Sequence, residues 1–320
     1  MKLKAFSGIL FGAVFALGIG STAVQADSYP SKPITMIIPL GAGGSHDLNA
    51  RVFTSIVPEY LGNAIIVKLM PGASGQKGTA AAARAKPDGY TLLFTHNYID
   101  QLQQHIEKLP YDTTKDLVTV ARLNYGPISL ITKPNKPWKN LKELIAYGKK
   151  NPGKLKMATS GNWGAVMVPA ARVFAKAGVQ VNYIPYKGGG PAFRAFLANE
   201  VDFTMMFPSV IKGRVKKGTI RVLASAGKKP MFKDAPTFSQ LGFDDDIGYM
   251  NRVILAPRGI PAARLKVLRT AIAKLKKNKT YKKMMKKLGE NTAYMSGDEY
   301  EKIRAKQKKR YGNLVKKLTN

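Results

Sequence analysis

Short apolar runs and longer amphipathic segments alternate along most of this chain. The short runs are rich in Ile, Val and Thr, which favour strands, and the longer segments place apolar residues at helical spacing, as at Leu48, Val52 and Ile56. Such alternation is typical of an α/β fold in which each sheet is mostly parallel and flanked by helices. We therefore expect strands and helices to follow one another along the chain.

The first group of elements lies before residue 95. A turn at Pro87-Asp88-Gly89 precedes the last strand of this group. The pattern predicts strands at 34–39, 64–69 and 90–94, and helices at 45–60 and 75–85.

A second group begins near residue 128 and repeats the cycle, from which we infer two lobes of similar build. The chain is expected to cross between them near 121–125 and again near 248–251. These crossings assign residues 27–124 and 250–320 to the first lobe and residues 125–249 to the second. The expected strands lie at 128–132, 155–158, near 183, and at 201–206, 220–225 and 253–256, and the helices at 141–149, 165–177 and 191–198.

The start of the chain has the pattern of an export signal. Lys2 and Lys4 precede an apolar stretch, residues 9–19, and small residues follow as far as Ala26. A membrane anchor is the alternative, but the apolar stretch is well short of the roughly 20 residues that span a bilayer. We expect a signal peptide, residues 1–26, cleaved after Ala26, and a soluble periplasmic protein. Because the chain has no cysteine, neither a lipid-modified cysteine nor a disulfide is expected.

The net charge of +33 is unusually high, and +31 remains after loss of Lys2 and Lys4. Residues 264–320 contain 19 Lys or Arg and only 4 Asp or Glu, placed among Leu, Ile and Met at helical spacing. A solvated amphipathic face explains this pattern without any partner. A basic protein that binds the envelope or nucleic acid is the alternative, although a recognised nucleic-acid motif and interleaved stacking aromatics are both missing. A positive field would also attract anionic ligands.

Two glycine-rich loops are the candidate binding elements. The first, Pro39 to Asp47, follows a strand and leads into a helix, and the second, Tyr186 to Ala192, does the same in the other lobe. Glycine lets the backbone approach a ligand closely, and a helix start contributes free N–H groups and partial positive charge. Ser45 adds a hydroxyl and Lys187 a cation, whereas Asp47 is a candidate helix cap. A plain glycine turn is the alternative for either loop alone, but together they predict a pincer for one carboxylate.

Residues that would support catalysis are few. The chain has no cysteine, no G-x-S-x-G elbow and no metal-binding spacing among His46, His96 and His105. Neither 41–46 nor 72–77 matches a nucleotide-binding fingerprint. We therefore expect binding without chemistry, with neither a cofactor nor a metal.

The three histidines have different expected positions. His46 lies in the first loop and is expected to contact a ligand. His96 follows a strand end, where lining a cleft and making a loop hydrogen bond are equally compatible with the pattern. His105 follows two glutamines in a polar helix and is expected to be solvated.

Taken together, these residues resemble the periplasmic substrate-binding proteins of tripartite tricarboxylate transporters, the TctC or Bug family. The resemblance covers essentially the whole mature chain. The segments that carry it are 29–34, 43–47, 71–75, 86–93, 185–188, 190–192, 201–203 and 235–237, the last near Gly242.

The resemblance implies a two-lobed periplasmic binding protein of type II-like fold that closes over an organic acid. In the family, loops matching Pro39 to Asp47 and Tyr186 to Ala192 hold the ligand's carboxylate, partly through water. Its members bind di- and tricarboxylates, acidic amino acids or aromatic acids, and serve a small four-span and a large multi-span membrane subunit. The resemblance implies no catalysis, and we expect a monomer that does not bind nucleic acid.

Two departures from the family pattern concern the pocket. A histidine usually precedes the helix after residue 158, where this chain has Met167 and Val168, and the crossing near Asn251 lacks the tryptophan common in relatives. Trp163 is a candidate aromatic wall that would favour a flat acid, although a tryptophan packed on the lobe surface is the alternative.

The predicted ligand-binding set combines the two loops with polar residues that follow strand ends, for which turn capping is the alternative role. It comprises Gly43, Gly44, Ser45, His46, Asp47, Ser74, Thr95, His96, Asn97, Ser160, Tyr186, Lys187, Gly188, Gly189, Gly190, Ala192 and Ser209.

Overall fold

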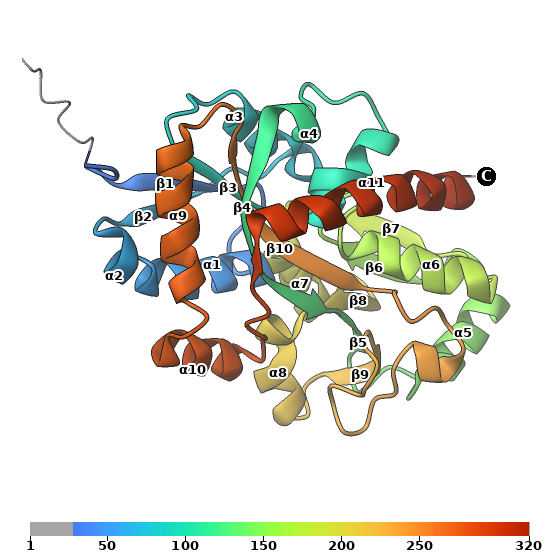
Figure 1. The fold of residues 1–320 in the computed structure, drawn as a ribbon. Coiled ribbons are helices and arrows are strands. Elements are labelled where there is room, and N and C mark those ends of the chain that lie inside the picture. Colours follow the sequence, from blue (N-terminus) through green and yellow to red (C-terminus); the bar gives the residue numbers. More distant parts are fainter. Residues whose placement is uncertain (1–27, 320) are drawn as a thin grey trace, which may run out of the picture.

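Two sheets, each flanked by helices, make up the part of the chain that the structure describes (Figure 1). The structure is a computed structural model and describes residues 28–319. The predicted signal peptide, 1–26, lies outside the described residues. The α/β, two-lobed architecture expected from the sequence is confirmed.

The first sheet has six strands in the order β11-β4-β10-β3-β1-β2. Pairing is parallel among β2, β1 and β3 and antiparallel among β3, β10, β4 and β11. The strands are β1 (Ile34–Ile38), β2 (Ile65–Leu69), β3 (Thr91–His96), β4 (Leu117–Pro127), β10 (Tyr249–Pro257) and β11 (Met295–Ser296). The helices around this sheet are α1 (Ser45–Ile56), α2 (Pro58–Leu61), α3 (Gln76–Ala83), α4 (Thr113–Asp116), α9 (Ala262–Lys274) and α10 (Lys279–Leu288).

The second sheet has five strands in the order β7-β6-β8-β5-β9. Here β7, β6 and β8 pair in parallel, whereas β5 runs antiparallel to both β8 and β9. The strands are β5 (Ser129–Thr132), β6 (Lys156–Thr159), β7 (Asn182–Pro185), β8 (Phe203–Met206) and β9 (Arg221–Ser225). Its helices are α5 (Leu141–Lys150), α6 (Met167–Ala177), α7 (Gly189–Leu197) and α8 (Pro208–Lys216).

Both sheets are therefore mixed, with parallel βαβ units at one side and antiparallel strands at the other. The antiparallel part arises from the connections between the lobes. Strand β4 leads directly into β5 through Ile128, and β10 returns from the second lobe beside β4, so these strands run against each other. The backbone N–H of Ile128 donates to the carbonyl of Gly248 at 3.0 Å, which ties the two connections together.

Alternating side chains along each central strand fill separate cores on the two faces of its sheet. In β1, Ile34, Met36 and Ile38 pack with α1, α9 and α10, whereas Ile37 packs with α3 on the opposite face. In the second lobe, one face packs with α5 and α6 and the other with α7 and α8. This two-residue periodicity is what a sheet covered on both faces requires.

Helix α11 (Gly297–Thr319) crosses from one lobe to the other (Figure 1). Tyr300 near its start is buried in the core of the first lobe, and Tyr311 and Val315 near its end are buried in the core of the second. A single helix therefore contributes to both cores.

Several boundaries differ from the sequence expectations for identifiable reasons. The helix expected over 45–60 is interrupted at Pro58, which lacks the N–H that a continuous helix needs, and Gly62 ends the following turn in a left-handed conformation. The segment 117–127 is an eleven-residue strand that the sequence analysis did not predict, and α8 was also missed. Short helical turns occur at Ala73–Gly75, Tyr98–Leu102, Gln103–His105 and Ser239–Leu241.

Candidate functional site

The first turns of α1 and α7 face each other across the boundary between the lobes. Each helix follows a glycine loop, and the loops touch directly, since the N–H of Gly41 donates to the carbonyl of Lys187 at 2.8 Å. In α1 the N–H groups of Ser45, His46 and Asp47 have no partner within the helix, because its first such bond runs from Leu48 to Gly44. In α7 the same holds for Gly189 and Gly190, whereas the third residue, Pro191, has no N–H. Two partly positive helix starts thus meet at one place.

Only glycine fits the closest points of this contact. A Cβ at Gly190 would lie 1.9 Å from the carbonyl oxygen of Ala42, and a Cβ at Gly188 would lie 2.6 Å from the nitrogen of Gly41. Gly188 also has a φ of 121°, which side chains with a Cβ rarely adopt. The sequence of the second loop is therefore matched to direct contact between the lobes, and at this separation no carboxylate fits between the two loops.

Two adjoining cavities lie beside the touching loops. The first has a volume of about 30 Å³, which corresponds to the space for a water molecule or two. The second has a volume of about 210 Å³. Both are lined by Leu40 and Ser160, so the two cavities adjoin each other between the lobes.

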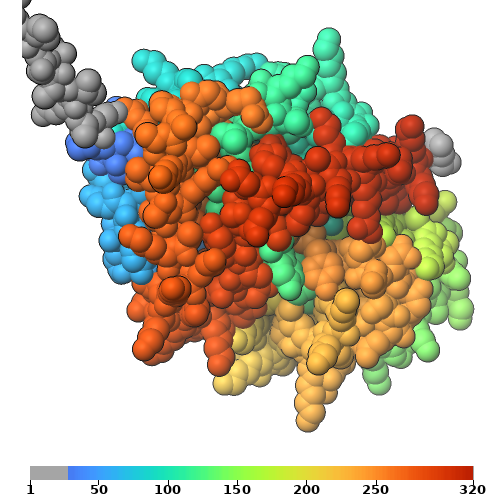
Figure 2. Space-filling model, in the orientation of Figure 1, coloured from blue at the N-terminus to red at the C-terminus, as the bar shows by residue number. Residues whose placement is uncertain are grey.

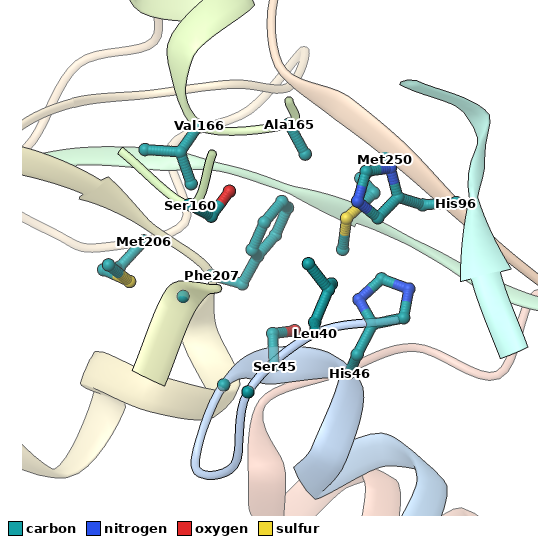
Figure 3. A pocket seen from close by; sticks show the side chains of 13 residues that line it. Leu40, Ser45, His46, His96, Ser160, Ala165, Val166, Met206, Phe207 and Met250 are labelled. Atoms are coloured by element: carbon teal, nitrogen blue, oxygen red, sulfur yellow. The ribbon is translucent and has the colours of Figure 1, made fainter. Parts of the chain in front are cut away.

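The first cavity is mostly apolar (Figure 3). Phe207 and Leu40 lie between the start of α1, which carries Ser45 and His46, and the loop that carries Ser160. Its apolar lining consists of Leu40, Ala165, Val166, Met206, Phe207 and Met250. Its remaining lining consists of Gly41, Gly44, Ser45, His46, His96, Ser160 and Gly189.

His46 and His96 form a buried pair with ring centres 5.0 Å apart. Burial, the neighbouring His96 and the charge of Arg252 hold the pKa of His46 well below its ordinary value. Burial and the charge of Arg252 lower the pKa of His96 to about 3. Both rings are therefore neutral near pH 7. His46 Nε2 donates to the carbonyl of Thr95 at 3.1 Å, while Nδ1 of His96 accepts from the N–H of Ile99 at 3.4 Å, which leaves the hydrogen of His96 on Nε2.

A fully buried ion pair lies next to this site. Arg252 in β10 donates to both carboxylate oxygens of Glu290 at 3.0 Å, to Asn124 Oδ1 at 3.0 Å and to the hydroxyl of Ser45. Ser209, at the start of α8 in the second lobe, donates to Glu290 at 2.6 Å. The charge of Arg252 is therefore already matched by Glu290, and the hydroxyl of Ser45 is engaged with this cluster.

The structure brings together much of the predicted ligand-binding set. Six members line the first cavity: Gly44, Ser45, His46, His96, Ser160 and Gly189. Four line the second: Ser74, Ser160, Tyr186 and Lys187. The rest line neither of these two cavities: Gly43, Asp47, Thr95, Asn97, Gly188, Gly190, Ala192 and Ser209.

Some members of this last group have local partners. Asp47 accepts from the N–H of Gly43 at 2.9 Å and pairs with Arg51 at 3.0 Å, so it holds the first loop against α1. Asn97 accepts from the N–H of Asn251 at 2.8 Å and donates to the hydroxyl of Tyr311. Ala192 is fully buried in the core beside α7.

Buried hydroxyls without a hydrogen-bond partner occur at two strand ends near the cavities. Thr95 in β3 and Thr159 in β6 are fully buried, and within the described part of the chain neither hydroxyl has a partner. They precede His96 and Ser160, which line the first cavity. A buried polar group without a partner is costly, so such groups point to an interaction with water or ligand.

Other side chains differ from the sequence expectations. His105 is half-buried under α11 and bonds through Nε2 to the carbonyl of Lys308 at 2.9 Å, so it is not the solvated residue that the polar sequence around it predicted. Trp163 packs against the core of the second lobe and lines neither of the two cavities. Four residues of the site were not predicted, because nothing in their local sequence separates them from ordinary strand and loop residues: Arg252, Glu290, Phe207 and Met250.

A metal-binding cluster and a membrane-spanning helix are both absent from residues 28–319. Within this range, no three His, Cys, Asp or Glu side chains are grouped so as to hold a metal ion. No helix in the same range has the length and apolar character needed to cross a bilayer.

Comparison with known proteins identifies the family of this chain. A model of the tripartite tricarboxylate transporter family receptor, TctC, matches residues 49–319. Protein BugT of Bordetella pertussis is 31% identical over 262 residues, which cover 81% of this chain and 79% of BugT.

Two solved structures extend the comparison. The periplasmic binding protein BugD is 27% identical, with a TM-score of 0.86 over 91% of this chain and 99% of BugD. A TctC solute-binding protein from Polaromonas, solved with no ligand, is also 27% identical and is covered over 99% of its length, with 90% of this chain matched, but at a TM-score of 0.64. The chain belongs to the tripartite tricarboxylate transporter receptor family, whose members are periplasmic binding proteins.

Proposed function

We propose that this protein captures a small organic carboxylate between its two lobes and delivers it to a tripartite transporter. The observation that carries the proposal is the meeting of two helix starts, α1 and α7, from different lobes beside a space lined by both. An anion placed there accepts hydrogen bonds from free N–H groups and is favoured by both helix dipoles. Neither lobe alone provides this arrangement.

The proposed lobes comprise residues 27–124 with 250–320, and residues 125–249. Strands β4 and β10 support this division, because they belong to the first sheet and connect to the second at their far ends. Rotation of one lobe about these connections would separate the glycine loops and admit a ligand.

Similarity to the two solved structures supports such a rotation. BugD and the Polaromonas protein have the same identity to this chain and nearly the same coverage, yet their TM-scores are 0.86 and 0.64. A difference in the relative orientation of two otherwise similar lobes lowers a TM-score in this way.

We propose that the carboxylate lies in the combined space of the two cavities. The N–H groups near Gly44 and Gly189 and the Nε2 hydrogen of neutral His96 are donors on one side. Ser160 and Lys187 are available on the other side, and the ammonium of Lys187 is exposed. The members of the predicted set that line neither cavity are proposed to shape the loops or to hold the lobes.

The lining favours an acid with an apolar body over a polyacid. Apolar side chains line the first cavity and can contact one side of a hydrocarbon or aromatic group held in the larger second cavity, whereas the guanidinium of Arg252 is already paired with Glu290. A second or third carboxylate buried there would lack a cationic partner, which is costly. Aromatic and aliphatic monoacids are therefore the favoured ligands, and aromatic acids are one of the classes that the family resemblance implies.

We further propose that the chain is exported and cleaved after Ala26, that it acts as a monomer without catalysis, and that it serves a small and a large membrane subunit. The family match supports a receptor role. The signal pattern in the sequence supports export.

Native mass spectrometry and thermal-shift screening of the mature protein test the ligand proposal. The screen contains citrate, a dicarboxylate, glutamate, and an aromatic and an aliphatic monoacid. We expect a monoacid to raise the melting temperature most, because a ligand that binds only the folded state stabilises it. The bound acid should have unchanged mass after prolonged incubation.

Two variants provide the controls. Lys187→Gln should weaken the binding of the acid, whereas Lys154→Gln, at an exposed lysine remote from both cavities, should not. Absence of stabilisation by any carboxylate would overturn the proposal, and stabilisation by citrate alone would overturn the preference for monoacids.

A further inference from the structure

Two neighbouring helices from different lobes carry a dense set of exposed positive charges. Helix α8 belongs to the second lobe and α10 to the first. We call their exposed cations the α8–α10 face. It comprises Lys212, Arg214, Lys216 and Lys217 at α8, and Lys279, Lys282, Lys283, Lys286 and Lys287 at α10.

The two helices are in contact. Lys212 Nζ donates to the carbonyl of Lys286 at 3.1 Å, and the side chain of Lys212 lies 3.0 Å from the position of a Cβ on Gly289. Figure 2 shows the end of the orange segment, which contains α10, against the yellow segment, which contains α8. The cations of both lobes thus form one continuous surface.

Carboxylates do little to neutralise this surface. No Asp or Glu occurs in 203–233 or in 247–289, the stretches that contain the two helices. Glu290 is buried and paired with Arg252, and Glu59, at the edge of the face, accepts from Asn278 at 3.3 Å. The positive field of the α8–α10 face is therefore largely uncompensated.

The residue types on this face indicate the kind of partner. Protein interfaces are depleted of Lys and rely on buried aromatic or Arg anchors, yet within residues 28–319 the large exposed apolar side chains are Ile66, Tyr147 and Val267, none of them on α8 or α10. Binding of single-stranded nucleic acid uses stacking aromatics, which these two helices do not expose. Clustered lysines without anchors suit the diffuse negative charge of anionic lipid headgroups.

We propose that the α8–α10 face binds the surface of an anionic phospholipid bilayer, and that closure of the lobes assembles it. When the glycine loops touch, α8 and α10 present their charges together, and when the lobes separate the two groups of cations move apart. Bilayer binding is therefore tighter for the closed protein, which places the closed receptor at the membrane in which a transporter is embedded.

The first experiment measures co-flotation of the mature chain with vesicles of equal parts phosphatidylglycerol and phosphatidylcholine, and with vesicles of phosphatidylcholine alone. The test variant changes Lys282, Lys283, Lys286 and Lys287 to Gln. The control variant changes Lys142, Lys149, Lys150 and Lys154 to Gln, which removes the same charge from exposed positions in and just after α5.

We expect the wild type to bind the anionic vesicles, with affinity falling steeply as salt is raised. Removing four lysines near the surface should weaken binding about tenfold or more, because each contributes independently to the attraction. The control variant should bind within about twofold of wild type. Equal losses in both variants, or no preference for anionic vesicles, would overturn the proposal, and so would tighter binding to duplex DNA than to the vesicles.

A second variant tests the dependence on closure without changing charge. Gly190→Val places a side chain where the carbonyl of Ala42 lies 1.9 Å from a Cβ, so the loops cannot stay in contact. Small-angle scattering should give a larger radius of gyration and vesicle affinity should fall several-fold. An opened variant with wild-type affinity would contradict the role of closure, and so would lost affinity at an unchanged radius. The vesicles contain no carboxylate ligand, so these outcomes are independent of the proposed ligand.

Discussion

Arg252 and Glu290 join four segments that are far apart in sequence. Arg252 is fully buried in β10, Glu290 follows α10, and the cluster also includes Ser45 at the start of α1 and Ser209 in the second lobe. Burying two charges is costly, and the cost is offset here by near-complete hydrogen bonding. The pair fixes the start of α1, on which the candidate site depends.

Removing one partner of this ion pair should be strongly destabilising. Glu290→Ala leaves the guanidinium of Arg252 buried without its counter-charge, and we expect the free energy of unfolding to fall by about 3–5 kcal/mol. The double variant Arg252→Met/Glu290→Leu should lose less than the single variant, because no uncompensated charge remains. Denaturant unfolding measures both, and a loss below about 1 kcal/mol in Glu290→Ala would contradict this assignment.

The buried histidines should make stability depend on pH. The pKa of His96 is lowered to about 3 in the folded protein, whereas an unfolded chain has an ordinary histidine near 6.5. Between these values the unfolded state binds the proton, so the stability present above pH 6.5 is lost as pH falls towards 3.

His96→Gln should reduce this loss. Its unfolding free energy should fall less steeply than that of the wild type between pH 6.5 and 4, by up to about 1.4 kcal/mol per pH unit. His105→Gln, at the half-buried histidine under α11, is the matched control. Parallel pH profiles for wild type and His96→Gln would show that His96 is not held neutral.

At the scale of elements, α11 packs against both lobes. Its first half pairs with the first lobe through Arg304, which donates to Asp100 at 2.6 Å in a buried ion pair, and its second half places Tyr311 and Val315 in the core of the second lobe. The lobes are therefore linked by this helix as well as by β4 and β10.

Shortening the side chain at Tyr311 tests this role of α11. Tyr311→Ala should lower the free energy of unfolding by about 3–5 kcal/mol through the cavity that it leaves, and Tyr311→Phe by about 1–2 kcal/mol through the donor left unpaired on Asn97. Hydrogen exchange should report lost protection in strands of both sheets for Tyr311→Ala. Loss confined to the second sheet would mean that the lobes are not coupled through α11.

Elements with strong periodicity were predictable, and those with ambiguous patterns were not. Strands such as β1 and helices such as α5 follow the expected ranges closely, because alternation and capping signals agree in them. Strand β4 was missed because Thr119, Arg122 and Asn124 interrupt its apolar pattern, although tertiary contacts bury or half-bury them. Pairing with β10, remote in sequence, makes it a strand.

The candidate site was predictable where a local motif marks it. The glycine loops were recognisable because close backbone approach requires glycine, and the structure places them in contact. Phe207, Met250 and the pair of Arg252 with Glu290 were not recognisable, since their importance arises from long-range packing between segments that carry no motif. Proximity in the fold, rather than residue type, brings Phe207 and Met250 to the first cavity and the ion pair next to it.

At the scale of the whole molecule, the net charge should affect stability. A chain with a charge of +33, or +31 after cleavage, repels itself more when compact than when unfolded. Raising NaCl from 10 to 150 mM should therefore increase the melting temperature by a few degrees, as screening reduces this repulsion. The variant with four α10 lysines changed to Gln should show a smaller salt-induced increase in melting temperature. Differential scanning fluorimetry measures both proteins. A melting temperature that falls with salt would mean that ion pairs outweigh the repulsion.

The direct contact between the two glycine loops sets a limit on how near the lobes can come. Since a backbone hydrogen bond already joins Gly41 to Lys187, no ligand can bring the lobes closer than this. A ligand that fits the two cavities beside the loops leaves this contact intact, whereas a larger ligand holds the loops apart. The outer surfaces of the two lobes are then nearest each other for ligands that fit these cavities and farther apart for larger ones.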